Sequence, residues 1–242
     1  MNQRSRLIEL IAFDADDTLW HNETIYTMTQ QRYKELLAPY HDGEIVDREL
    51  YETEMRNLAR YGYGIKSFTL SMIETAIELT DGRVGGAEIR QIIEFAHDML
   101  RTPVRLMDGV EEVVAALASD YQLMVISKGD LLDQETKLAG SGLAPYFDHV
   151  EIVSNKRPET YAQLLAKHDM PAEYFMMVGN SLPSDVLPVT SIGGHGVYIP
   201  YHVTWAHEVV DEENVADEEY TRLDDIRQLP GLLAGDSHQR LQ

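Results

Sequence analysis

Two patterns of apolar and polar residues divide the chain. Over residues 24–101, apolar side chains recur every three or four positions, which is the spacing of amphipathic helices, and no strand pattern interrupts them. From residue 103 onward, short apolar runs typical of buried strands alternate with helical segments, and residues 7–13 form another such run. This order predicts an α/β fold, in which a parallel sheet with helices on both faces carries a block of helices inserted after its first strand.

Four helices are expected in the inserted block, which therefore resembles a helical bundle. They cover about residue 24 to a break after Pro39, residues 47–61, a segment that begins with Ser67 as its N-cap, and residues 86–100. Apolar positions expected to share a face in the first helix, or to point inward in the third, are Ile25, Met28, Leu36, Leu37, Leu70, Ile73, Ile77 and Leu79.

The remaining elements alternate as strand and helix. Strands are expected over residues 121–126, 150–153, 174–178 and 196–199, and helices over 109–118, 130–140, 158–168, from about 183, and over 224–233. The acidic residues 208–219 are expected to form a solvated loop.

Composition narrows the classes of partner. The formal net charge is −21, with 41 acidic and 20 basic residues, which argues against nucleic acid or an anionic membrane surface as the main partner. The chain has no cysteine, so disulfides and thiolate chemistry are excluded. No apolar run approaches the length that spans a membrane, and the short polar start leads into a strand, so we expect a cytoplasmic protein.

Polar side chains follow the first four strands of the expected sheet. Asp14, Asp16 and Asp17 follow the first strand, Ser127 ends the second, Lys156 follows the third, and Asn180 and Asp185 follow the fourth; all lie at the edge where open parallel sheets bind ligands. Clustered carboxylates are costly to desolvate, and Mg²⁺ is a common compensating cation. An acidic turn, a strand-end hydroxyl and a surface lysine are the ordinary alternatives for these residues taken singly.

Taken together, the segments that follow these four strands resemble the haloacid dehalogenase superfamily, most of whose members are phosphohydrolases. Asp14-x-Asp16-x-Thr18 looks like its first motif, Ser127 its second, Lys156 its third, and Gly179-Asn180-Ser181 through Asp185 its fourth. The resemblance implies a Rossmann-like core over residues 1–20 and 103–242 and a type C1 helical cap over residues 21–102. Two departures are Asn180, where the family usually has Asp, and Arg157, which separates Lys156 from the following proline.

The resemblance also implies roles for these residues. Asp14 would attack phosphorus to form an aspartyl-phosphate, and Asp16 would protonate the leaving oxygen and then deprotonate water. Mg²⁺ would be bound by Asp14, the main-chain carbonyl of Asp16, and Asn180 or Asp185. Lys156 would neutralise charge on the nucleophile and the phosphoryl group. Candidates for ordering the site or binding phosphate or substrate are Thr18, Ser127, Lys128, Lys66 and Tyr63.

Several interpretations stay open at the level of the sequence. Tyr63 and Lys66 lie in a glycine-flanked segment that resembles a loop reaching the active site, but an ordinary helix–helix turn fits equally. His202 and His207 suggest zinc only weakly, because no further ligand has a convincing spacing. Trp20 and His21 begin the connection to the helices and are candidates for lining a cleft.

The main expectation is a Mg²⁺-dependent phosphatase acting on a small phosphorylated metabolite. One alternative is a dehalogenase, which in this superfamily lacks the second aspartate and needs no metal, so Asp16 and Asp185 argue against it. The other alternative is a non-catalytic binding protein on the same fold. The sequence names neither the substrate nor the oligomeric state.

Overall fold

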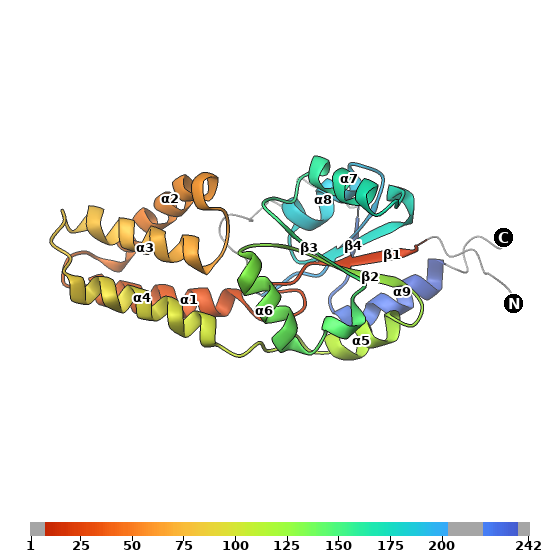
Figure 1. Ribbon diagram of the computed structural model, residues 1–242, viewed down its shortest axis with the longest axis horizontal. Helices are drawn as coiled ribbons and strands as arrows, with labels where there is room; N and C mark the ends of the chain where they lie inside the picture. Colours follow the sequence, from red (N-terminus) through yellow and green to blue (C-terminus); the bar gives the residue numbers. More distant parts are fainter. Residues whose placement is uncertain (1–7, 203–219, 237–242) are drawn as a thin grey trace, which may run out of the picture. The chain divides into compact units, whose positions relative to one another are not determined.

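The computed structural model describes residues 8–202 and 220–236 (Figure 1). The chain forms two compact units by its internal contacts. We call the first the sheet unit; it consists of Met1–His21, Val104–Ser127 and Leu138–Gln242. We call the second the helical unit; it consists of Asn22–Pro103 together with Lys128–Lys137.

The sheet unit contains a six-stranded parallel sheet in the described part of the chain, so the expected α/β class is confirmed. The strand order is β3-β2-β1-β4-β5-β6. The strands are β1 (Leu10–Phe13), β2 (Gln122–Lys128), β3 (His149–Val153), β4 (Phe175–Gly179), β5 (His195–Tyr198) and β6 (Thr221–Arg222). Strands β2 and β3 follow outward on one side of β1, and β4, β5 and β6 follow outward on its other side. The strand order therefore reverses between β1 and β4, which is where open sheets bind ligands.

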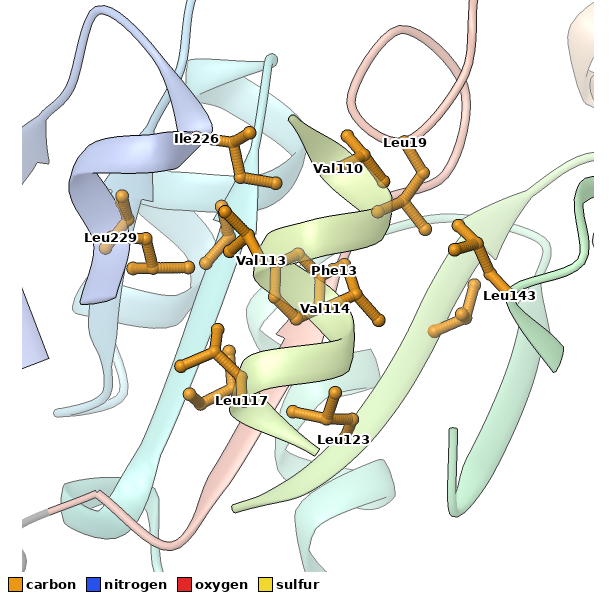
Figure 2. Close-up of a cluster of buried hydrophobic side chains, with 14 of the residues drawn as sticks. Phe13, Leu19, Val110, Val113, Val114, Leu117, Leu123, Leu143, Ile226 and Leu229 are labelled. Atoms are coloured by element: carbon orange, nitrogen blue, oxygen red, sulfur yellow. The ribbon is translucent and has the colours of Figure 1, made fainter. Parts of the chain in front are cut away.

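Both faces of the sheet are buried, which explains why its strands are continuous apolar runs. Ile11 and Phe13 of β1 pack with α5 (Val110–Leu117) and α9 (Leu229–Asp236), whereas Leu10 and Ala12 pack on the opposite face with α7 (Pro158–Lys167) and α8 (Leu187–Thr190). Figure 2 shows Phe13 beneath Val113 and Val114 of α5, in the first of these two clusters. Strand β1 therefore lies in the middle of the sheet with both faces packed. This packing fixes the position of the residue that follows it.

The helical unit contains α1 (Glu23–Leu37), α2 (Gly43–Tyr61), α3 (Ile65–Leu79) and α4 (Gly86–Arg101), and α6 (Leu131–Ser141) begins in it. Two details of the sequence prediction were wrong. Helix α3 begins at Ile65 after Gly64, so Ser67 is not its N-cap but a buried residue in its first turn. Leu70 and Ile77 of α3 are exposed rather than inward.

The inward-facing side of α3 instead carries small and polar side chains beside large apolar ones. These buried residues are Ser67, Phe68, Ser71, Met72, Thr75 and Ala76, with Ile65 at the start of the helix. The Ser71 hydroxyl can face inward because it hydrogen-bonds the helix itself, with Oγ donating to the Ser67 carbonyl at 3.0 Å. A search for apolar spacing alone misses such a face.

Candidate active site

The loop after β1 is a tight turn that presents Asp14 and Asp16. The Asp14 N–H donates to the Val178 carbonyl at 2.9 Å, so pairing with β4 continues one residue past β1. The Ala15 carbonyl then accepts hydrogen bonds from the N–H groups of Thr18, Leu19 and Trp20. This turn requires a left-handed residue, and Asp17 supplies it with φ of 62°, a conformation that Asp tolerates better than most residues.

Lys156 joins two of the predicted site carboxylates. Its ammonium donates a hydrogen bond to Asp14 Oδ1 and another, of 2.6 Å, to Asp185 Oδ1. All three side chains are buried. A lysine in this position is stable only because two carboxylates compensate for its loss of water. Three segments therefore meet at one place, namely the end of β1, the segment after β3 and the turn after β4.

The environment shifts the pKa values of this pair. Burial raises the pKa of Asp14 to about 7; the Lys156 charge opposes this shift and the Asp185 charge adds to it. Burial by itself lowers the pKa of Lys156, but the Asp14 and Asp185 carboxylates outweigh it, and the pKa of Lys156 is raised. The lysine is therefore charged at every physiological pH, whereas Asp14 takes up a proton readily as long as no further cation lies beside it.

Asp185 is held by its own turn. Residues Leu182–Val186 form a single π-helical turn, and within it Asp185 Oδ2 accepts from the Ser181 N–H at 3.0 Å. A Cβ placed on Gly179 would lie 2.3 Å from the same oxygen, so only glycine leaves room for this carboxylate. Both oxygens of Asp185 are thus engaged, one by Lys156 and one by the Ser181 N–H.

Thr18 links the first and fourth motifs. Its hydroxyl lies 3.3 Å from Asp14 Oδ2 and 3.2 Å from Asn180 Oδ1. A carboxylate oxygen and an amide oxygen therefore converge on one point, and both are hard donors of the kind that Mg²⁺ prefers. No cluster of three or more His, Cys, Asp or Glu side chains suited to a metal occurs among residues 8–202 and 220–236. A magnesium site here would thus depend on amide and main-chain oxygens besides Asp14.

Asp16 is oriented by a tryptophan. The buried indole of Trp20 donates its Nε1–H to Asp16 Oδ1 at 2.7 Å. From the sequence, Trp20 was a candidate for lining a cleft, and this contact was not predicted. The only signal in the sequence was that Asp16 and Trp20 are four residues apart. That spacing brings them together only because the chain forms a tight turn between them, which the sequence did not reveal.

The remaining candidates divide between the two units. Ser127 is buried near the end of β2, the strand beside β1. Lys66, Tyr63 and Lys128 belong to the helical unit, where Lys66 pairs with Asp130 at 2.9 Å and the Lys128 ammonium lies 4.4 Å from the centre of the Tyr63 ring. Their roles toward a substrate stay predictions.

Other features noted in the sequence carry less chemistry. The ring centres of His202 and Tyr201 lie 4.1 Å apart with the planes inclined by 48°, whereas His207 and the acidic stretch at 208–219 lie outside the described residues. His21 Nδ1 lies 2.8 Å from the Tyr201 hydroxyl, and burial lowers the pKa of His21. In the part of the chain that the structure describes, no helix has the length and apolar character needed to cross a membrane.

The motifs and their geometry agree with a family assignment. A family model described as haloacid dehalogenase-like hydrolase matches residues 8–193, which include every strand-end residue discussed above. The chain belongs to the haloacid dehalogenase-like hydrolase family. It is accordingly a hydrolase, as expected from the sequence.

Similar proteins within this hydrolase family include phosphatases and dehalogenases. A glyceraldehyde 3-phosphate phosphatase from Pyrococcus furiosus is 24% identical over 204 residues, covering 81% of this chain and 82% of the relative. A haloacid dehalogenase-like hydrolase structure from Xanthomonas campestris is 40% identical, with a TM-score of 0.86, covering 99% of this chain and 97% of that chain. A 2-haloacid dehalogenase structure from Pseudomonas syringae, 21% identical with a TM-score of 0.62, covers 94% of this chain and 99% of that one and shares the fold.

Proposed function

We propose that this hydrolase is a Mg²⁺-dependent phosphomonoester hydrolase that acts through an aspartyl-phosphate at Asp14. The observation that carries the proposal is the different surroundings of the two Asp14 oxygens. Oδ1 accepts from the Lys156 ammonium, while Oδ2 lies beside Thr18, whose hydroxyl also meets the Asn180 amide oxygen. Lys156 thus provides a fixed positive charge at Oδ1 of the proposed nucleophile. The oxygen atoms near Oδ2 are of the kind that bind a metal cation.

The donor set fits a hard divalent cation. Asp14, the main-chain carbonyl of Asp16 and the side-chain oxygen of Asn180 are the ligands we assign to it. Asp185 is assigned a different role, because its oxygens are already engaged by Lys156 and the Ser181 N–H. When bound, Mg²⁺ supplies positive charge that offsets the repulsion between Asp14 and the phosphoryl oxygens.

The proposed reaction has two displacements at phosphorus. A carboxylate oxygen of Asp14 forms a bond to phosphorus while the bond to the ester oxygen breaks, and Asp16 gives its proton to the departing oxygen. Water then attacks the aspartyl-phosphate, Asp16 takes the water proton, and the bond from phosphorus to Asp14 breaks to release inorganic phosphate. Lys156 and Ser127 are assigned to the transferred phosphoryl group, which carries the charge in both steps.

The substrate is proposed to be a small phosphorylated metabolite. The curated relative named above as a glyceraldehyde 3-phosphate phosphatase supports this class, and triose phosphates belong in any panel of trial substrates. Lys66, Tyr63 and Lys128 are the proposed substrate contacts in the helical unit, which we propose to be the specificity domain.

Turnover of p-nitrophenyl phosphate tests the proposal. We expect activity with Mg²⁺, loss of activity with EDTA, and recovery when Mg²⁺ is restored. Rapid acid quenching should trap one phosphate per active chain in the wild type and none in Asp14→Asn. The matched control is Asp133→Asn, which changes an aspartate of the helical unit to the same amide and should retain full turnover.

The same assay separates the rival activity. The protein is also incubated with a 2-haloacid, and halide release is measured with and without EDTA. Halide release that needs no metal, without phosphate release from any ester, would contradict the phosphatase assignment and support a dehalogenase. Full phosphatase activity in Asp14→Asn would contradict the choice of nucleophile.

A further inference from the structure

Trp20 has a fixed position at the end of the catalytic turn. Its indole is almost completely buried, and its carbonyl accepts from the Asp17 N–H at 2.7 Å. Trp20 also forms an isolated bridge with Leu106, and the flanking Leu19 carbonyl accepts from the Met107 N–H at 3.0 Å. The turn that carries Asp16 is therefore paired with the segment around Leu106, and Trp20 has little freedom to move.

The indole packs in the larger hydrophobic cluster of the sheet unit. Leu19 and Val110 belong to the same cluster and appear near the start of α5 in Figure 2. Packing of this kind fixes the ring plane, and the ring plane fixes the direction of the Nε1–H bond. A buried indole N–H needs an acceptor, and here the acceptor is the carboxylate of Asp16.

We propose that Trp20 is a positioning residue for proton transfer by Asp16, an inference that rests on the phosphatase function proposed above. An indole N–H can only donate a hydrogen bond. Asp16 Oδ1 must therefore accept in both protonation states, and the proton that Asp16 transfers resides on Oδ2. The 2.7 Å contact thus selects which oxygen gives its proton to the leaving group and later takes one from water.

Loss of the N–H would remove the hydrogen bond that fixes Oδ1 as the acceptor, so the acid form of Asp16 would no longer be restricted to carrying its proton on Oδ2. General acid catalysis matters most for esters whose leaving oxygen is a strong base and matters little for activated esters. The effect of losing Trp20 should therefore depend on the leaving group. A defect in folding or in phosphate binding would instead slow all esters alike.

The test measures kcat/KM for a series of substituted phenyl phosphates in Mg²⁺. For Trp20→Phe we expect a change within about threefold for p-nitrophenyl phosphate and a loss of about tenfold or more for the least activated ester, so that the slope against leaving-group pKa steepens. Val110→Ala, a packing control from the same cluster, should lower the melting temperature and leave the slope unchanged. In an Asp16→Asn background, Trp20→Phe should have no further effect on the slope.

A second measurement does not depend on activity. The chain has two tryptophans, so the indole N–H resonance of Trp20 is the one that remains in Trp205→Phe. Asp16→Ala should move this resonance upfield and speed its exchange with solvent. An unchanged resonance would overturn the contact, even if Trp20→Phe does not fold.

The outcomes distinguish the two proposals. No wild-type turnover of any ester overturns the proposed phosphatase function. Wild-type turnover together with an unchanged slope in Trp20→Phe overturns the positioning role alone. Equal losses for all esters in Trp20→Phe also overturn it, because they indicate a general structural defect.

Discussion

At the scale of single residues, Lys156 and burial together determine how Asp14 responds to pH. The pKa of Asp14 is about 7 in the folded protein without a bound cation, compared with 3.8 for the isolated side chain. The folded state therefore binds the Asp14 proton more tightly than the unfolded state between these two values. Through linkage, this group lowers the free energy of unfolding as pH rises from about 4 to about 7, and adds no further change above that.

This sign gives a prediction for Asp14→Asn in EDTA. The melting temperature of the variant minus that of the wild type should increase between pH 4 and pH 7 and then level off. The difference is the proper quantity, because other carboxylates, such as Asp130 beside Lys66, have a lowered pKa and act in the opposite direction. Thermal unfolding in matched buffers measures it, and a flat difference across the range would contradict the raised pKa.

Asn180 gives the second prediction at this scale. If its amide oxygen binds Mg²⁺ directly, Asn180→Asp adds a negative charge to the ligand set and should lower the half-saturating Mg²⁺ concentration by about tenfold. Asp185→Asn should mainly reduce kcat, because Asp185 holds Lys156. Activity titrated with Mg²⁺ separates the two effects. A larger shift in Mg²⁺ dependence for Asp185→Asn than for Asn180→Asp would reverse the assignment.

That these residues come together could be predicted from the sequence because each follows a strand, whereas their chemical roles stay predictions. Asp14, Lys156 and Asp185 meet in the structure, as their places after parallel strands require. The contact of Trp20 with Asp16 was not predictable, since it depends on a turn in which Asp17 adopts a positive φ. Local geometry of this kind has no simple periodic signal.

At the scale of elements, the turn after β4 depends on one glycine. Gly179→Ala would place a Cβ 2.3 Å from Asp185 Oδ2 and 2.5 Å from its Cβ, so the π-helical turn must shift. We expect the free energy of unfolding to fall by about 1–3 kcal/mol. We also expect at least a tenfold loss in kcat, because Asp185 would move away from Lys156. Gly86→Ala in α4, where an added Cβ meets nothing within 4 Å, is the control and should change neither value appreciably. Unfolding and steady-state kinetics measure both.

The start of α2 shows what an element boundary requires. The sequence predicted a break after Pro39 and a second helix that begins only at residue 47. In the structure Asp42 is the N-cap, and its carboxylate accepts from the Glu44 N–H at 2.9 Å. Apolar periodicity becomes visible only after the first turn, whereas the cap is identified by its side chain.

Asp42 therefore carries a stability prediction of its own. Asp42→Ala should cost about 1 kcal/mol, since the Glu44 N–H loses its acceptor, and Asp42→Ser should cost only a few tenths. Denaturant unfolding measures both values. Equal losses for the two substitutions would show that the cap does not act through this hydrogen bond.

At the scale of the whole molecule, the sequence indicated the architecture well because the sheet is buried on both faces. Continuous apolar strands and helical periods were enough to place β1 to β5, and the insertion after β1 followed from their order. Strand β6 was missed because it has only two residues, too few for any pattern. The extension of the helical unit to Lys128–Lys137 was also not visible, since it follows from contacts made after folding.

The last prediction concerns this extension and the specificity we assign to the helical unit. Lys66 pairs with both oxygens of Asp130, and Lys128 lies over Tyr63, so the turn between α2 and α3 is attached to the residues that follow Ser127 in the chain. The Lys66 side chain is 62% exposed, and exposed ion pairs contribute at most about 1 kcal/mol. Lys66→Ala should therefore change the melting temperature little.

Its kinetic effect should be selective. We expect Lys66→Ala to reduce kcat/KM for the best metabolite in a phosphate-ester panel by about tenfold and to leave p-nitrophenyl phosphate within about twofold. Ser127→Ala should impair both substrates, because it acts on the phosphoryl group that they share. Arg32→Ala, which removes another exposed ion pair of the helical unit, is the control and should impair neither. If Lys66→Ala behaves like Arg32→Ala on every substrate, the turn only connects two helices, and specificity resides in other residues of the helical unit.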